Sequence, residues 1–105
     1  SRASSGNIKL EITNIDFVEL VQQTTGEFEE KYAIRHLEIV NTLPNEVIMI
    51  EADGRRLWRV LENLYNNAFK YALEGTRVYV TIEDHGADVV FTIKKTAGLS
   101  LAHDR

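Results

Sequence analysis

Hydrophobic and polar residues alternate with a helical period in two stretches of the chain. The first stretch predicts an amphipathic helix over residues 17–31, with Asp16 and Glu19 spaced as a capping box and Gly26 as a weak point. The second predicts a helix that starts near Asp53 and ends before Gly75. The apolar stripes are Phe17, Leu20, Val21, Thr24 and Phe28 in the first helix and Leu57, Val60, Leu61, Leu64, Ala68 and Tyr71 in the second.

Shorter segments follow the two-residue period of strands. The order is one strand, a helix, two strands, the second helix and two more strands, with turns between the paired strands. This order predicts an α+β fold, a two-layer sandwich in which a mixed sheet carries its helices on one face. Leu57, Leu61, Leu64 and Ala68 should pack on the inward residues Val78, Val80, Ile82, Val89, Phe91 and Ile93. The expected strands cover residues 9–13, 37–40, 47–50, 77–83 and 88–93.

Composition and charge limit the kinds of protein to which this chain can belong. With 105 residues, 44% hydrophobic and 27% charged, the chain matches one globular domain. It has no cysteine, which excludes disulfides, thiolate metal sites and thiol nucleophiles. The net charge of −4 disfavours a broad nucleic-acid interface. No apolar run approaches the roughly 18 residues of a membrane span, and the first six residues do not form a signal peptide.

The second helix carries the candidate chemistry. Asn63, Asn67 and Lys70 follow one another at i, i+4 and i+7, so they share a narrow edge beside the apolar stripe. Amide oxygens can bind a hard cation such as Mg²⁺, and an ammonium group can bind phosphate. The alternative is an ordinary solvated helix edge, which the spacing alone favours.

The sequence around these residues resembles a known motif. Residues 56–71, RLWRVLENLYNNAFKY, resemble the N box of sensor histidine kinases, whose pattern is RL-x-x-VL-x-NLL-x-NA-x-KY. The resemblance extends over the opening and up to Ile93, especially towards kinases of Gram-positive type. It implies the Bergerat (GHKL) ATP-binding fold shared with gyrase, the Hsp90 chaperones and MutL.

The resemblance also implies roles for individual residues. Asn67 would be the Mg²⁺ ligand, and Asn63 would face the phosphates of ATP. Lys70 would contact phosphate, and Tyr71 would pack near the nucleotide. Asn66 lies at a variable position of the motif, and its helical angle should turn it further into solvent, outside the site. The resemblance supplies no catalytic residue in this chain.

Two departures from the family pattern follow the last expected strand. Lys95 stands where the family has an Asp or Asn that accepts a hydrogen bond from adenine, and lysine has no acceptor. Gly98 to Ala102 looks like the end of a glycine-rich box that opens a helix, so Gly98 and Leu99 would bind the nucleotide phosphates.

The lid that precedes this box in the family has no counterpart here. Our first interpretation is that a disordered lid is left out between Ala97 and Gly98, so that these residues are not bonded. A designed or a natural deletion of the lid are the alternatives.

Together these features predict a single domain. Residues 1–8 would end a dimerisation helix or linker, 9–97 would form the N-box core, and 98–105 would be the remnant of the glycine-rich box. The resemblance implies a histidine protein kinase catalytic domain that holds Mg-ATP for transfer to a histidine on a separate dimerisation domain, and that is inactive alone. The alternative is a degenerate module of the same fold that no longer binds ATP.

The expected partners follow from that family. They are the dimerisation and phosphoacceptor domain of the same kinase and, through the parent protein, a response regulator. No nucleic acid and no membrane contact is expected for this fragment, which would lie in the cytoplasm below a membrane-anchored parent. His36, His85 and His103 lie outside any phosphoacceptor motif and should be ordinary surface residues.

Overall fold

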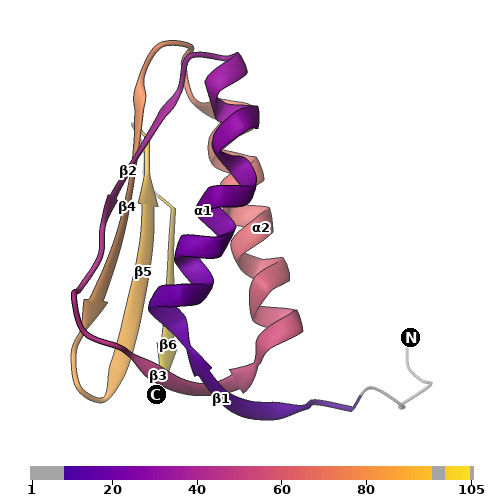
Figure 1. Cartoon of the computed structure of the whole chain (residues 1–105), viewed down its shortest axis with the longest axis vertical. Coiled ribbons are helices and arrows are strands. Elements are labelled where there is room, and N and C mark those ends of the chain that lie inside the picture. Colours follow the sequence, from indigo (N-terminus) through magenta and orange to yellow (C-terminus); the bar gives the residue numbers. More distant parts are fainter. Residues whose placement is uncertain (1–8, 96–98, 105) are drawn as a thin grey trace.

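The computed structural model describes residues 9–95 and the backbone of residues 99–104. Strands and helices follow one another in the predicted order, with one additional strand near the C-terminus (Figure 1). The elements are β1 (Ile12–Asp16), α1 (Phe17–Ile34), β2 (Glu38–Thr42), β3 (Met49–Asp53), α2 (Gly54–Tyr71), β4 (Arg77–Asp84), β5 (Asp88–Lys94) and β6 (Leu99–Asp104).

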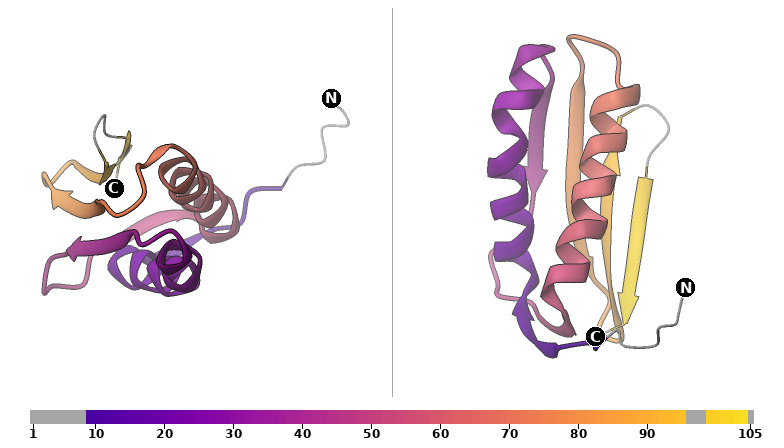
Figure 2. Two further views of the ribbon diagram at one scale, coloured as in Figure 1. Left: turned by 90° about the horizontal axis from the view of Figure 1, so that it is seen from above. Right: turned by 90° about the vertical axis from the view of Figure 1, so that its right-hand side faces the viewer.

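The strands form two separate sheets. The larger has the order β2-β4-β5-β6, in which β2 runs parallel to β4 and the other neighbours are antiparallel. Both helices lie side by side on one face of this sheet, which confirms the predicted two-layer sandwich (Figures 1 and 2). The smaller sheet pairs only β1 with β3.

The small sheet sets the starting points of the helices. Each of its strands runs directly into a helix, β1 into α1 and β3 into α2. Asp16 caps α1 by accepting a hydrogen bond from the Glu19 N–H at 3.1 Å, as the sequence predicts. Asp53 caps α2 in the same way, with 3.3 Å to the Arg56 N–H. The pairing of β1 with β3 therefore links the starts of the two helices.

The core lies between the helices and the four-stranded sheet. All six predicted inward residues of β4 and β5 are buried, as are Leu57, Leu61 and Ala68 of α2. Tyr65 is fully buried and stacks on Phe28 and Phe91, with ring centroids 5.3 and 6.1 Å apart. Burial raises the pKa of its hydroxyl to about 12, so the side chain stays neutral near pH 7.

Parts of the predicted stripe of α2 are wrong. Val60 and Tyr71 are 39% and 61% exposed, whereas Leu64 is half-buried and packs against the core as predicted. Tyr65 joins the buried stripe instead, because its helical angle lies about 40° from that of Leu61, on the side away from Val60 and Tyr71. No helix among the described residues is long and apolar enough to cross a bilayer.

Candidate functional site

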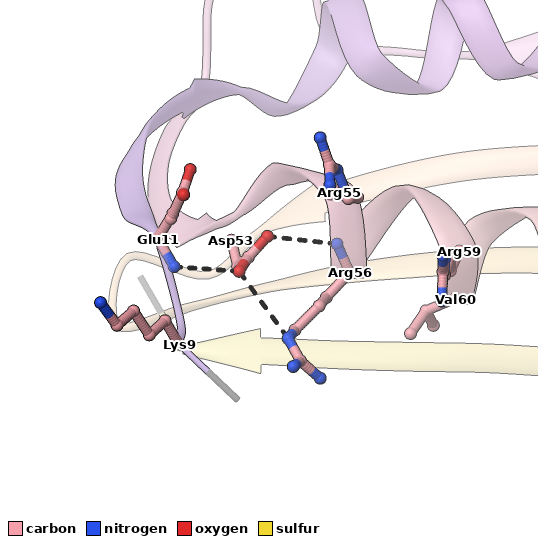
Figure 3. Close-up of a pocket in the computed structure, with 7 residues that line it drawn as sticks. All are labelled: Lys9, Glu11, Asp53, Arg55, Arg56, Arg59 and Val60. Carbon is pink, nitrogen blue, oxygen red and sulfur yellow. Dashed lines mark hydrogen bonds and ion pairs between the residues drawn. The ribbon is translucent and has the colours of Figure 1, made fainter. Parts of the chain in front are cut away.

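The start of α2 is held by its capping residue. The Asp53 carboxylate accepts a hydrogen bond from the Glu11 N–H at 3.0 Å and lies 3.7 Å from the Arg56 Nε (Figure 3). The hydrogen bond from Glu11 is the main reason that the pKa of Asp53 lies below its ordinary value. The carboxylate thus fixes the first turn of the helix against the segment that leads into β1.

The polar edge of α2 is solvent-exposed over its whole length. Asn63, Asn67 and Lys70 are all exposed, while the opposite side of the same turns is buried in the core. Tyr71 is exposed as well, and the Lys70 ammonium lies 5.5 Å from the centre of its ring. The two amides and the ammonium are therefore free to meet a ligand, and none of them supports the core.

Two arginines to which the sequence motif assigned no role extend this edge. Arg56 and Arg59 precede Asn63 by seven and four residues, and both are exposed. With Val60 they line an open cavity of about 500 Å³ (Figure 3). Its other lining residues are Lys9, Glu11, Asp53 and Arg55. The spacing that linked the asparagines could have revealed these cations, since 56, 59, 63, 67 and 70 follow one helical face.

Asn66 is less exposed than Asn67, so the prediction that Asn66 turns further into solvent was wrong. Its side chain is half-buried, and its amide oxygen accepts a hydrogen bond from the Lys31 Nζ at 2.9 Å. The helical angle was correct, but α1 packs on this side of α2 and supplies the lysine. The neighbouring asparagines therefore differ in kind: Asn66 contacts α1, and Asn67 is exposed.

The C-terminal residues depart from the predicted glycine-rich box. Leu99–Asp104 forms β6, which pairs with β5 so that Leu99 lies opposite Ile93, and it does not begin a helix. The open edge of β5 offers backbone partners along its length, and an extended chain can use all of them. Gly98 and the junction between Ala97 and Gly98 lie outside the described residues. Lys95 is half-buried directly after β5.

The donor set suits magnesium bound together with phosphates better than an all-protein metal cage. No group of three or more His, Cys, Asp or Glu residues that could hold a metal ion occurs in the part of the chain that the structure describes. Mg²⁺ keeps several waters and commonly takes one or two protein oxygens together with phosphate oxygens. An exposed amide oxygen such as that of Asn67 fits this mode of binding.

Comparisons with known proteins agree with the motif. No protein-family model matches the chain. It is 29% identical over 103 residues to the alginate biosynthesis sensor protein KinB of Pseudomonas aeruginosa, which covers 88% of this chain and 17% of KinB. It is 30% identical over 93 residues to the sensor protein KdpD of Clostridium acetobutylicum, covering 89% of this chain and 10% of KdpD. The chain thus spans less than a fifth of either relative.

Solved structures share the fold. The nucleotide-free catalytic domain of histidine kinase ThkA superposes with a TM-score of 0.75 at 30% identity, covering 79% of this chain and 56% of that one. ThkA in complex with the response regulator protein TrrA matches equally well, at 31% identity over 80% of this chain and 25% of that chain. Full-length ShkA in complex with AMPPNP has a TM-score of 0.75 at 27% identity, over 85% and 19% of the two chains.

These similarities confirm the resemblance carried by the N box and the Bergerat fold that it implies. The chain is identified as an HATPase domain of the sensor histidine kinase family.

Proposed function

We propose that this domain binds Mg-ATP along the exposed edge of α2 and presents the γ-phosphate to a histidine on a separate dimerisation domain. The observation that carries the proposal is an edge of amides and cations that contributes nothing to the core of the fold. Two asparagines lower helix propensity, so helix stability does not explain them.

Each residue of the edge has a proposed role. Asn67 would give its amide oxygen to Mg²⁺, and Asn63 would face the phosphates. The Lys70 ammonium would contact phosphate, and Tyr71 would lie beside the nucleotide. All four side chains are exposed on one helix, which is what a ligand laid along that helix requires.

Electrostatics supports an anionic ligand at this edge. The chain carries a net charge of −4, yet Arg56, Arg59 and Lys70 place three cations on one face of α2. Cations that follow one face of a helix raise the local potential for an anion even when the protein as a whole is acidic. The related kinase ShkA was crystallised with the nucleotide analogue AMPPNP, which makes a nucleotide the natural ligand to test.

The chemistry of the step asks little more of this domain than positioning. Phosphoryl transfer depends on alignment of donor and acceptor and on neutralisation of the phosphate charge. Asn67 would hold the metal ion, which would supply part of that charge neutralisation, and Lys70 would supply another part. The nucleophile would be the acceptor histidine, so no catalytic residue is assigned to this chain.

The partners are part of the proposal. The domain would dock on the dimerisation and phosphoacceptor domain of its own kinase, and the parent protein would pass the phosphoryl group to a response regulator. ThkA, which matches this chain, forms a complex with the response regulator TrrA. The parent would be anchored in a membrane with this domain on the cytoplasmic side.

Titration with a fluorescent ATP analogue tests the proposal directly. The wild-type chain should bind saturably in the presence of Mg²⁺, and Asn67→Ala should weaken the Mg²⁺-dependent binding by about tenfold or more, as expected for loss of a metal ligand contact. Gln23→Ala, an exposed amide on α1, serves as the matched control and should bind like the wild type. Equal binding by Asn67→Ala would refute the assigned site.

A degenerate module of the same fold is the second candidate. Two observations favour it: Lys95 has no hydrogen-bond acceptor for adenine, and Leu99–Asp104 is an edge strand where a phosphate-binding helix start was expected. A wild-type chain that shows no saturable, Mg²⁺-dependent binding would support this candidate against the kinase proposal.

A further inference from the structure

We propose that Arg35, assisted by Lys31, acts as a positioning residue that sets the orientation of the last two turns of α2. These turns carry Asn67 and Lys70, so the inference rests on the proposed function and deepens it. Neither residue of α1 would touch the nucleotide. Their effect would pass through Asn66 and Phe69, which lie on the side of α2 that faces α1.

Arg35 closes the C-terminal end of α2 from a different helix. Its Nη1 donates to the Phe69 carbonyl oxygen, and its Nη2 donates to the Ala72 carbonyl oxygen at 2.8 Å. The last carbonyls of a helix have no partner within the helix, and the negative end of the helix dipole favours a nearby cation. The rigid fork of the guanidinium holds two carbonyls at once, so it restrains direction as well as distance.

Two cations of α1 and its C-cap lie close to the Phe69 ring. The Arg35 guanidinium lies 5.1 Å from the centre of its ring, and the Lys31 Nζ lies 4.8 Å from the same centre. Both distances fall within the range of cation–π attraction. The Lys31 Nζ also donates to the Asn66 amide oxygen at 2.9 Å. We call Lys31, Arg35, Asn66 and Phe69 the interhelix clamp.

The two clamp residues on α2 are sequence neighbours of the proposed ligand-binding residues. Asn66 immediately precedes Asn67, and Phe69 immediately precedes Lys70. One turn earlier, the buried Tyr32 hydroxyl donates to the Tyr65 carbonyl oxygen at 2.6 Å and ties the same two helices together. Rotation of α2 about its axis would break these contacts and would carry the amide of Asn67 and the ammonium of Lys70 away from their ligand. Small misplacements of positioning groups have large effects on ligand geometry.

The test compares three variants of the full chain. Arg35→Met keeps the apolar stem and removes the fork, and Arg35→Lys keeps the charge with one donor group. Asp16→Ala removes the cap of α1 and lowers stability at the other end of that helix. Nucleotide binding is measured with the fluorescent ATP analogue and Mg²⁺ at a temperature where every variant is folded, and backbone amide shifts are recorded by two-dimensional NMR without nucleotide.

We expect Arg35→Met to weaken binding by about tenfold, the lower end of the effect seen for residues that orient ligand-binding groups. Arg35→Lys should recover part of that loss, and Asp16→Ala should bind like the wild type despite its lower stability. The amide resonances of Asn67 and Lys70 should shift in Arg35→Met and stay unchanged in Asp16→Ala.

The outcomes separate this inference from the proposed function. A wild-type chain that binds no nucleotide overturns the proposed function and the inference with it. Normal binding by a folded Arg35→Met variant overturns the inference alone. The inference is also overturned if Arg35→Met and Asp16→Ala both weaken nucleotide binding in proportion to their loss of unfolding free energy. The interhelix clamp would then only stabilise the fold. If Arg35→Met does not fold, Arg35→Lys decides by the same measurements.

Discussion

The two helices are built alike and differ in what they show to solvent. Each has 18 residues, follows an aspartate cap at the end of a strand, and packs on the same sheet. The exposed residues of α1 include the acidic Glu27, Glu29 and Glu30, of which Glu27 accepts a hydrogen bond from the Trp58 indole of α2. The outer edge of α2 instead carries arginines, asparagines and a lysine.

Helix stability explains the solvent edge of α1, but at the edge of α2 it explains only Lys70, which lies in the last turn. α1 has Glu19 in its first turn and Lys31 in its last, which complements the helix dipole. α2 has no acidic residue in its first turn and has Arg55 and Arg56 there, where cations are unfavourable. The comparison teaches that the fold requires the buried stripes, and that the exposed edge of α2 has another origin, which we assign to ligand binding.

Removal of a buried side chain of α2 should have the largest effect on stability. Leu61 is fully buried in the core, so Leu61→Ala should lower the free energy of unfolding by about 2–5 kcal/mol. Val60 is 39% exposed on the next position of the same helix, and Val60→Ala is the control, with a change within about 0.5 kcal/mol. Urea denaturation measures both. Equal losses would mean that the burial contrast within α2 is wrong.

Removal of a cation from the exposed edge should affect binding and spare stability. Lys70→Ala should weaken binding of the ATP analogue by about tenfold or more, the loss expected for a charge-assisted contact of about 1.5–3 kcal/mol. Its free energy of unfolding should change by only about 0.5 kcal/mol, as for an ordinary surface residue. Glu30→Ala on α1 is the matched control for an exposed charge and should not weaken binding. Unfolding of Lys70→Ala would instead assign Lys70 to the fold.

The cap of α2 should give the chain a distinct loss of stability in acid. The hydrogen bond from the Glu11 N–H holds the pKa of Asp53 below its ordinary value of 3.8. Its stabilising contribution is therefore complete above the ordinary pKa and is lost as the pH falls through the lower folded-state pKa. Between about pH 5 and about pH 2.5, the urea midpoint of the wild type should fall further than that of Asp53→Asn, which keeps an acceptor but does not titrate. Parallel curves would show that Asp53 does not contribute in this way.

A small gain in stability should come from the weak point of α1. Gly26 lies inside the helix, and an added Cβ would meet no atom within 4 Å other than those of its neighbours and of the adjacent helix backbone. Gly26→Ala should therefore raise the free energy of unfolding by about 0.5–1 kcal/mol through the higher helix propensity of alanine. The control is Gly75→Ala, where a φ of +83° makes a side chain unfavourable, so this variant should be less stable than the wild type. A loss of stability in Gly26→Ala would indicate that α1 needs flexibility at this point.

Local patterns predicted most of the fold. The period of apolar residues located α1 and α2 to within a few residues, because a helix that packs on a sheet must place one stripe in the core. Asp16 capped the predicted helix because its side chain reaches a backbone N–H only three residues away. The exposed edge of Asn63, Asn67 and Lys70 followed from the same angular rule. Their roles toward ATP and Mg²⁺ stay predictions.

Contacts between distant segments could not be predicted in this way. The sequence predicts the direction in which Asn66 leaves the axis of α2. Lys31 lies 35 residues earlier in the chain, and only the packing of α1 on α2 brings it to the Asn66 amide. Val60 and Tyr71 fit the apolar period, yet they lie about 80–100° around α2 from the fully buried Leu61 and are exposed. Leu99–Asp104 forms a strand because it pairs with the open edge of β5. The local pattern of residues 99–104 does not reveal this partner.

The sequence by itself therefore determined the helices, the cap of α1, the hairpin of β4 and β5 and the polar edge of α2. These features depend on residues a few positions apart, and the local backbone conformation fixes how such residues lie relative to one another. Only the tertiary structure decided that β1 and β3 form a separate ribbon, that β6 joins the sheet edge, and that Arg35 closes the end of α2. Those arrangements depend on which surfaces meet when the helices and the sheet pack together, and the same local sequence is compatible with several such partners.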